Sequence, residues 1–340
     1  MDRRPIWTLD SGMTNSTNGK ETPAIVQDVV QAFDEFNGLH PGFRPAHAKG
    51  ILLTGNFTPS SDALSLTRAP HISRSSTPVT VRFSDFAGIP TIPDSGPDAT
   101  PNGIAIRFML GAHVHTDIIG HSVDGFPART AGEFVEFLRA AIASKNSTAK
   151  PLPIEGFLAT HPAALEFVQT PKPVPASFAK QTFFSVSSYK FVNKDGEARY
   201  GRYRIRPDGP GEFLDALTAA KMKPDFLFDD IQERVSRGPV KMHIFVQIAA
   251  PGDVTDDSTV HWPNDRPEVA FGSVELTGVA PDNAEEQRHI IFDPIPRVDG
   301  IEPSADPLLE VRAETYLFTG RRRRRAANPV AASSEAAVAG

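Results

Sequence analysis

The spacing of hydrophobic residues divides the chain into helical and strand-forming segments. Residues 22–36 carry hydrophobic side chains three or four positions apart, which predicts a helix with one buried face that ends at Gly38. A second helix is predicted after Thr130, because Thr130 and Glu133 form a capping box and hydrophobic residues then recur on one face. Shorter helices are predicted around residues 163–168, 212–222, 225–237 and 312–316.

Much of the remaining chain has the pattern of short strands. Between residues 49 and 119, hydrophobic runs are separated by clusters of Pro, Gly, Ser and Asp. Further strands are predicted at residues 182–193, 198–206, 240–249 and 268–277. Strands do not alternate with crossover helices, which disfavours a doubly wound dinucleotide-binding fold. The pattern therefore predicts a mainly β, α+β protein whose core is an antiparallel barrel with inserted helices.

The composition is typical of a soluble globular protein without disulfides. Hydrophobic residues make up 40% and charged residues 22% of the 340 positions, and no hydrophobic run is long enough to cross a bilayer. The absence of cysteine excludes thiolate zinc sites, iron–sulfur clusters and thiolate-ligated haem. The first residues lack the hydrophobic core of a signal peptide, so we expect a cytoplasmic location.

The two ends of the chain differ from the region between them. Residues 1–20 are rich in polar residues and are predicted to form an irregular arm. Residues 326–340 are small and polar and are predicted to be a disordered tail. The intervening residues 21–325 are predicted to form a single domain.

Five consecutive arginines occupy residues 321–325, although the net charge of the chain is −6. We expect these arginines to belong to a solvated, partly disordered tail. Nucleic-acid binding would need interleaved aromatic residues or a folded basic face, and the sequence indicates neither. We therefore expect no nucleic-acid partner, and no membrane partner.

Two short segments carry the chemistry that the sequence suggests. Arg312 and Tyr316 are four residues apart in a helix-compatible stretch, so their side chains share one helix face. A guanidinium beside a phenol favours the phenolate, which is a hard anionic ligand suited to ferric iron. In the other segment, His47 lies between Arg44 and a turn of small residues, which offers an acid/base group with a cation nearby. Together the segments suggest redox or peroxide chemistry at iron.

A resemblance to a known family covers both segments and the region between them. It is carried, in order along the chain, by residues 44–50, 81–84, 102–108, 117–122, 189–193, 300–306 and 312–316. The chain resembles the haem catalases, and more closely the short catalase-related peroxidases. The resemblance implies an eight-stranded antiparallel β-barrel with haem b held against its outer edge by helices. Only 24 residues follow Tyr316 (340 minus 316), so it implies the catalase core alone, over residues 21–325, and no NADPH site.

The resemblance implies a role for each residue on the proximal side of the haem. Tyr316 would be the iron ligand, as tyrosine is in catalase, and Arg312 would keep its oxygen ionised. In larger catalases a histidine and an aspartate support this arginine. Asp306 matches the aspartate, but Ser187 stands at the histidine position, so the support is weakened.

On the distal side, the resemblance implies that His47 is the acid/base that moves the peroxide proton. Ser84 would hydrogen bond the other imidazole nitrogen and fix the tautomer. The family has an asparagine at the next distal position, and here His121 stands in its place with Ser122 beside it. Either of these two residues could hydrogen bond the bound peroxide.

The remaining implied residues hold the haem itself. Arg44 and Arg82 match arginines that bind haem propionates, since a guanidinium can bind a carboxylate with two hydrogen bonds. Arg323 matches a third such arginine, although the run of arginines leaves its register open. Phe134 matches the aromatic residue that packs on the distal haem face.

The predicted function is therefore a haem-dependent peroxidase that reduces hydrogen peroxide and organic hydroperoxides with an electron donor, and has weak catalase activity. One alternative is a catalase-core enzyme that rearranges fatty-acid hydroperoxides, of the allene-oxide-synthase type. Another is a haem-binding protein without turnover. The oligomeric state is expected to be monomer or homodimer.

Overall fold

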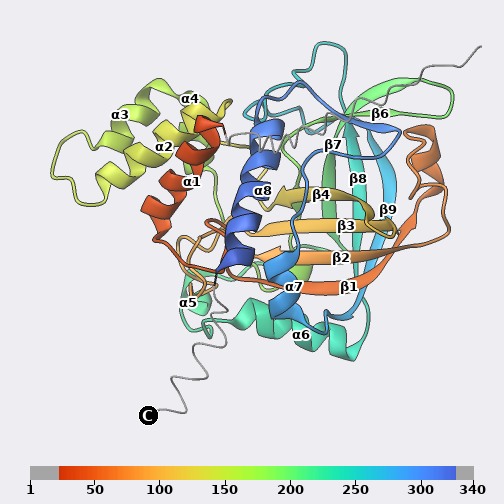
Figure 1. Cartoon of the computed structure of the whole chain (residues 1–340), viewed down its shortest axis with the longest axis horizontal. Coiled ribbons are helices and arrows are strands. Elements are labelled where there is room, and N and C mark those ends of the chain that lie inside the picture. Colours follow the sequence, from red (N-terminus) through yellow and green to blue (C-terminus); the bar gives the residue numbers. More distant parts are fainter. Residues whose placement is uncertain (1–22, 327–340) are drawn as a thin grey trace, which may run out of the picture.

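The computed structural model describes residues 23–326, and their core is an antiparallel β-barrel (Figure 1). The strands of the described residues are β1 (Gly50–Pro59), β2 (Thr77–Ser84), β3 (Gly103–Gly111), β4 (Val114–His121), β5 (Phe183–Phe184), β6 (Tyr189–Val192), β7 (Ala198–Pro207), β8 (Val240–Ile248), β9 (Glu268–Val279) and β10 (Ile301–Pro303). Hydrogen bonds run in the order β7–β5–β4–β3–β2–β1–β9–β8, and β8 pairs with β7 to close the ring. The two remaining strands, β6 and β10, extend from β7. The predicted eight-stranded antiparallel barrel is therefore confirmed.

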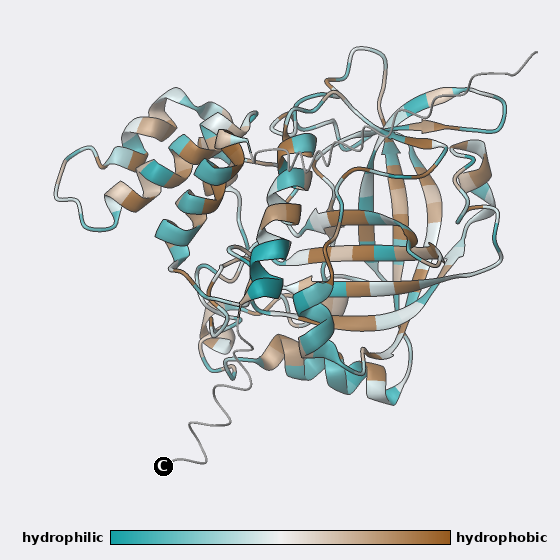
Figure 2. Cartoon of the chain, in the orientation of Figure 1, coloured by the Kyte–Doolittle hydropathy of each residue, from teal (hydrophilic) through white to brown (hydrophobic). Residues whose placement is uncertain are grey.

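Aromatic residues fill the barrel. Phe57, Phe83, Phe108, Phe191 and Phe271 are completely buried, and the rings of Phe57 and Phe108 meet edge to face with centroids 4.9 Å apart. Successive strand residues point to opposite faces. Since Phe83 points inward, its neighbours in β2 are directed to the outer surface. Figure 2 shows the resulting mixture of hydrophobic and hydrophilic positions along the strands.

The register of β1 to β4 aligns one row of residues at the edge of the barrel. Gly50 pairs with Ser84, Ser84 pairs with Gly103, and Gly103 pairs with His121. Two of the predicted site residues, Ser84 and His121, therefore lie two strands apart across a glycine. Neighbouring strands are about 5 Å apart, so the register keeps these two backbones within about 10 Å of each other.

Helices cover this edge of the barrel. The helices of the described residues are α1 (Ala24–Asn37), α2 (Ala131–Ser144), α3 (Pro153–Thr160), α4 (Pro162–Gln169), α5 (Ala216–Ala219), α6 (Phe226–Arg237), α7 (Asn283–His289) and α8 (Leu308–Arg325). Figure 1 shows α8 between the barrel and the group formed by α1 to α4. Leu309 of α8 belongs to the hydrophobic core of the barrel, whereas Leu308 packs into a second core with Val29 of α1 and Val135 of α2. The α8 helix thus joins the two cores.

The helices predicted from residue 22, after Thr130, and around 163–168 and 225–237 agree with α1, α2, α4 and α6, whereas α8 begins at Leu308, before the predicted residue 312. Thr130 accepts a hydrogen bond from the Glu133 amide at the start of α2, but the Glu133 carboxylate accepts from the Arg129 amide. The helix predicted at 212–222 is only the single turn α5, because the Glu212 and Leu214 amides bond to distant carbonyls. Neither α3 nor α7 is predicted from the sequence.

The strand predicted at residues 182–193 is also wrong in its continuity. It is divided into β5 and β6 by a buried serine segment, in which the Ser185 hydroxyl bonds to the Ser187 carbonyl. Hydroxyl groups that bond to nearby backbone compete with the strand ladder. The break leaves Ser187 buried and outside both strands, with its hydroxyl 3.3 Å from Arg312 Nη1 of α8.

The prediction for the arginine run was wrong. Residues 321–325 continue α8, and Figure 2 shows them as the hydrophilic end of that helix. Arg322 forms an ion pair with Asp34 of α1, with Nη2 2.9 Å from Oδ1. Arg323 is buried, and Arg324 donates to the His289 carbonyl. Partners on α1 and beside α7 therefore order a segment that its charge alone would leave solvated.

No helix among residues 23–326 is long and hydrophobic enough to cross a membrane. The predicted arm at residues 1–20 lies outside the described residues, and so does the predicted tail except Ala326. That residues 21–325 form one domain stays a prediction.

Candidate active site

A histidine–serine pair lies where β1 begins and β2 ends, with His47 in the segment before β1 and Ser84 as the last residue of β2. His47 Nδ1 is 3.1 Å from Ser84 Oγ. His47 has a φ of 56°, in the left-handed region that non-glycine residues rarely adopt. Its amide donates to the Phe86 carbonyl at 2.7 Å, and Arg82 donates to its carbonyl at 2.9 Å. These bonds from neighbouring segments hold the strained residue in one conformation.

Gly103 makes room for this pair. A Cβ atom at position 103 would lie 2.7 Å from Ser84 Oγ and 2.8 Å from His47 Nδ1. The sequence shows only an Asn-Gly step at the start of β3, and nothing in it indicates that the glycine faces a histidine. Gly103 was therefore missed by sequence reasoning, because its importance depends on the pairing of β2 with β3.

His121 lies across Gly103 from Ser84. The Val123 amide is 3.4 Å from His121 Nδ1, which leaves Nε2 for another partner. The Ser122 hydroxyl accepts from the Asn102 amide at 3.0 Å, and the Ser122 amide donates to the Asn102 carbonyl at 2.9 Å. Of the two candidates for the second distal position, His121 therefore has a side-chain nitrogen left to bind a ligand, whereas the Ser122 hydroxyl is already hydrogen bonded.

Both imidazoles are held neutral. Burial, and after it the charge of Arg82 and the nearby His121, lower the pKa of His47 to about 3. Burial also lowers the pKa of His121 to about 3, with the charges of Arg312 and Lys172 adding to the effect. A neutral imidazole can accept a proton at one nitrogen while the other is hydrogen bonded.

Arg312 and Tyr316 contact each other on α8, as their spacing predicted. Arg312 Nε is 3.4 Å from Tyr316 Oη, and Arg312 Nη1 is 3.3 Å from Ser187 Oγ. Burial lowers the pKa of Arg312, but the interactions with Tyr316, Tyr189 and Asp306 outweigh the effect of burial and raise the pKa. The serine at the position of the family's histidine thus still contacts the arginine, and Asp306 acts through its charge.

Three arginines from distant segments gather beside α7. Arg44 donates to the carbonyls of Gln287 and Ile290, at 3.2 and 3.1 Å. Arg323 donates to the Ile290 carbonyl at 2.7 Å, and Arg82 donates to the Gln287 side chain at 2.9 Å. All of these acceptors are neutral.

None of these three arginines forms an ion pair within residues 23–326. Burial, and after it the charge of Arg323, lower the pKa of Arg82 to about 9. Burial and the other two arginines lower the pKa of Arg44 in the same way. Buried cations without counter-ions are costly, so this cluster is suited to an anion.

Phe134 lies among other phenylalanines. Its ring centroid is 5.6 Å from that of Phe33 on α1 and 5.2 Å from that of Phe126. It therefore forms part of the core between α1 and α2. The predicted contact of Phe134 with a haem face stays a prediction.

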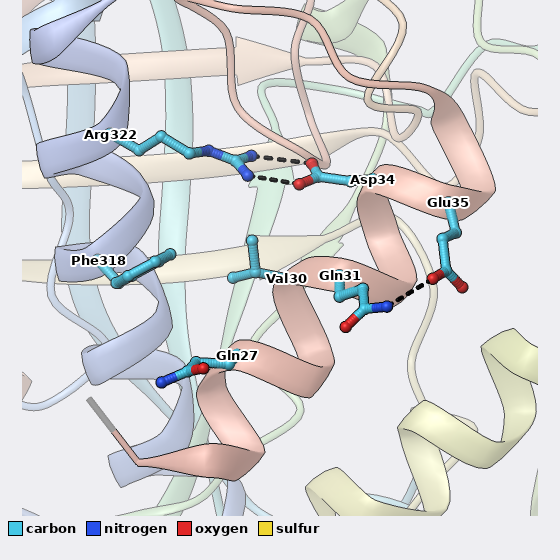
Figure 3. A pocket seen from close by; sticks show the side chains of 7 residues that line it. All are labelled: Gln27, Val30, Gln31, Asp34, Glu35, Phe318 and Arg322. Carbon is cyan, nitrogen blue, oxygen red and sulfur yellow. Dashed lines mark hydrogen bonds and ion pairs between the residues drawn. The ribbon is translucent and has the colours of Figure 1, made fainter. Parts of the chain in front are cut away.

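A separate cavity of about 650 Å³ lies between α1 and α8. Figure 3 shows that Phe318 and Arg322 of α8 line it together with Val30 and Asp34 of α1. At 100° per residue, Phe318 and Arg322 lie 200° and 240° around the helix from Tyr316. The cavity is therefore on the opposite side of α8 and contains none of the predicted site residues.

The chain is thus an antiparallel β-barrel protein with a cluster of buried polar residues at one edge of the barrel. Residues 8–331 match the family model for catalase, so the chain belongs to the catalase family. It is 35% identical to a catalase-related peroxidase of Mycolicibacterium paratuberculosis, over 88% of this chain and 94% of that protein. It is 32% identical to a catalase-related peroxidase of Synechococcus elongatus, over 94% and 95% of the two chains. As a member of this family it is an oxidoreductase that acts on peroxide.

Larger catalases share the fold. The chain is 27% identical to a catalase of Schizosaccharomyces pombe, over 94% of this chain and 67% of that protein. The structure of catalase A from Saccharomyces cerevisiae superposes with a TM-score of 0.73 at 22% identity, over 95% of this chain and 68% of that one. The chain thus spans about two thirds of the length of these catalases.

Substitution of Gly103 tests the geometry of the histidine–serine pair. The added methyl group of Gly103→Ala should push Ser84 and His47 apart and lower the rate of reaction with hydrogen peroxide by roughly 10- to 100-fold. Stopped-flow absorbance measures this rate. Gly278→Ala is the matched control, because no atom lies within 4 Å of the added Cβ. Equal rates for both variants would show that the spacing of the pair is not required.

Proposed function

We propose that the protein is a haem b peroxidase that reduces hydrogen peroxide and organic hydroperoxides, with weak catalase activity. The observation that carries this proposal is the pair of cationic sites near the edge of the barrel. Arg44, Arg82 and Arg323 form one, and Arg312 beside the Tyr316 oxygen forms the other. The relatives named catalase-related peroxidase, which the chain covers over 94% and 95% of their length, support it.

The residues present fit the proposed cofactor. The carboxylates of a haem would supply the anions that the three buried arginines lack, and a guanidinium can bind a carboxylate with two hydrogen bonds. The hydrogen bond from Arg312 stabilises negative charge on the Tyr316 oxygen, which suits that oxygen as an iron ligand. Bound haem would supply the two-electron oxidation and reduction that cleaves the peroxide bond.

His47 would carry the proton of the reaction. Its neutral imidazole can accept the proton of the peroxide oxygen that binds and deliver it to the oxygen that leaves. The contact with Ser84 fixes which ring nitrogen faces the peroxide. With two electrons and two protons from a donor, a hydroperoxide ROOH then yields ROH and water.

His121 would be a second hydrogen-bonding group for the peroxide. Because its Nδ1 faces the Val123 amide, the opposite nitrogen can donate to a bound oxygen. The imidazole ring is wider than the amide that the family has at this position, so it should hold a second hydrogen peroxide less well. This difference supports peroxidase turnover over catalase turnover.

The two alternatives are weaker. A rearrangement of fatty-acid hydroperoxides would use the same tyrosine and histidine, and analysis of the products separates it from reduction. A carrier without turnover has no need of a histidine that Phe86 and Arg82 hold in a strained conformation and whose ring contacts Ser84. We keep monomer or homodimer as the proposed assembly.

Substitution of the proposed iron ligand is the most direct test of the cofactor. Tyr316→Phe removes the ligand oxygen while keeping the ring, so the purified protein should lose haem or the charge-transfer band of a phenolate ligand. Absorption spectra of the variant and the wild type measure both. Leu317→Phe, at an exposed position on the same helix, is the control. An unchanged haem spectrum in Tyr316→Phe would reject the assignment.

The proposed proton carrier is tested by kinetics. His47→Ala should slow the reaction with hydrogen peroxide by ~10²–10⁴-fold while haem content stays near that of the wild type. Because the pKa of His47 is lowered to about 3, the active neutral form persists in acid, and the wild-type rate should stay flat from neutral pH down to about pH 5. Stopped-flow rates against pH measure both effects, and a loss of rate below pH 6.5 would contradict the lowered pKa.

Choice of peroxide separates the peroxidase from a catalase. The protein should oxidise a dye donor with cumene hydroperoxide and should release oxygen from hydrogen peroxide far more slowly than a larger catalase does. An oxygen electrode and dye absorbance measure the two activities on one preparation. Rapid oxygen release without cumene hydroperoxide activity would identify a true catalase. Conversion of fatty-acid hydroperoxide without consumption of the dye would identify the rearranging enzyme.

A further inference from the structure

A buried polar cluster lies directly behind the histidine–serine pair. The side chains of Asp85 and Asp94 are both fully buried. Lys49 donates to Asp94, and its Nζ is 2.7 Å from the exposed Asp225 and 3.8 Å from Asp85 Oδ2. One lysine therefore faces two buried carboxyl groups, which leaves one negative charge too many if both are ionised.

The hydrogen bonds show which carboxyl group is the neutral one. Asp94 has a donor for each oxygen, since Oδ1 accepts from Lys49 and Oδ2 accepts from the Leu227 amide at 2.7 Å. Asp85 Oδ1 accepts from Asn102 Nδ2 at 3.0 Å, but Oδ2 has no donor within the described residues and faces the Asp94 carboxylate. Two carboxyl groups can bond to each other only if one carries a proton. A proton on Asp85 Oδ2, donated to Asp94, gives every carboxyl oxygen of the pair a hydrogen-bond partner.

The electrostatics agree with this assignment. Burial, and after it the charge of Asp94, raise the pKa of Asp85 to about 9. Lys49 and the Asn102 amide oppose the rise, and Arg82 also interacts with Asp85 through its charge. Burial raises the pKa of Asp94 too, against its bonds from Lys49 and Leu227. The pair therefore holds one proton at neutral pH.

The cluster is joined to both members of the histidine–serine pair. Lys49 is two residues after His47, and Asp85 follows Ser84. The Asp85 amide donates to the Lys49 carbonyl at 3.2 Å, and the Asp85 backbone acts on the His47 ring, since it raises the pKa of His47 against the effect of burial. Asn102 links the cluster to the other distal segment, because its side chain donates to Asp85 and its backbone amide donates to the hydroxyl of Ser122, beside His121.

We propose that Asp85 and Asp94 share one proton and, with Lys49, act as positioning residues that hold His47 and Ser84 in their reactive geometry. The proposal rests on the function proposed for His47. Loss of the shared proton in alkali would place two negative charges side by side in the core, push Asp85 from Asp94 and loosen the segment that holds His47. The peroxide reaction should then fail at high pH because of Asp85, although Asp85 touches neither peroxide nor cofactor.

Asparagine substitutions distinguish the two carboxyl groups. Asp85→Asn supplies an amide donor in place of the proton, so the rate with hydrogen peroxide at pH 7 should stay within about threefold of the wild type. The wild-type rate should fall with an apparent pKa of about 9, and this fall should be absent in Asp85→Asn. Asp94→Asn leaves Lys49 without its buried counter-ion and should slow the reaction roughly 10- to 100-fold at pH 7. Asp225→Asn, which changes only the exposed partner of Lys49, should match the wild type at all pH values.

Thermal unfolding of the haem-loaded protein gives a second readout that does not depend on turnover. Between about pH 4 and about pH 9, the Asp85 carboxyl group binds a proton in the folded state but not in the unfolded state. Its contribution to the stability of the fold therefore declines as pH rises through this range. The unfolding temperature of Asp85→Asn should lack this decline. An alkaline fall in rate that persists in Asp85→Asn, or loss of its rate at pH 7, would overturn the proposal. If His47→Ala also reacts at the wild-type rate, the failure lies in the proposed function instead.

Discussion

The register of the first four strands is the constraint on which the site depends. Because Gly50, Ser84, Gly103 and His121 lie in one row across β1 to β4, residues that are up to 71 positions apart in the chain (121 minus 50) meet at one edge of the barrel. A shift of one residue in any pairing would turn Ser84 or His121 toward the hydrophobic interior. The buried phenylalanines on the opposite strand face prevent such a shift, since it would also bring them to the outer surface. The core of the barrel therefore fixes the polar edge.

The α8 helix adds the second constraint. Arg312, Tyr316 and Arg323 are separated by four and seven residues, so all three lie on one helix face. Leu308 and Leu309 fix the rotation of the helix by packing into two different cores. Arg322, on another face, is tied to α1 through Asp34. One helix thus presents the tyrosine–arginine pair and one of the three arginines without counter-ions.

Charge is distributed unevenly around this edge. The three arginines beside α7 have neutral acceptors, whereas Lys49 has more carboxyl groups than it can neutralise. We infer an anion for the first group and a shared proton for the second. Both histidines lie near these charges and stay neutral, which keeps an imidazole nitrogen able to accept a proton.

The sequence alone determined the local features. The spacing of hydrophobic residues was enough for α1, α2, α6 and most of the strands, and the spacing of Arg312 and Tyr316 was enough for their contact, because these depend on the periodicity of a strand or a helix. The eight-stranded closure of the barrel came from the family resemblance, because it depends on pairing between distant strands. Only the tertiary structure revealed the role of Gly103 as the space behind His47, the order of the arginine run against α1 and α7, and the pairing of Asp85 with Asp94. Each of these depends on contacts between segments distant in the chain, and local patterns carry no information on which distant group will neutralise a charge or fill a space.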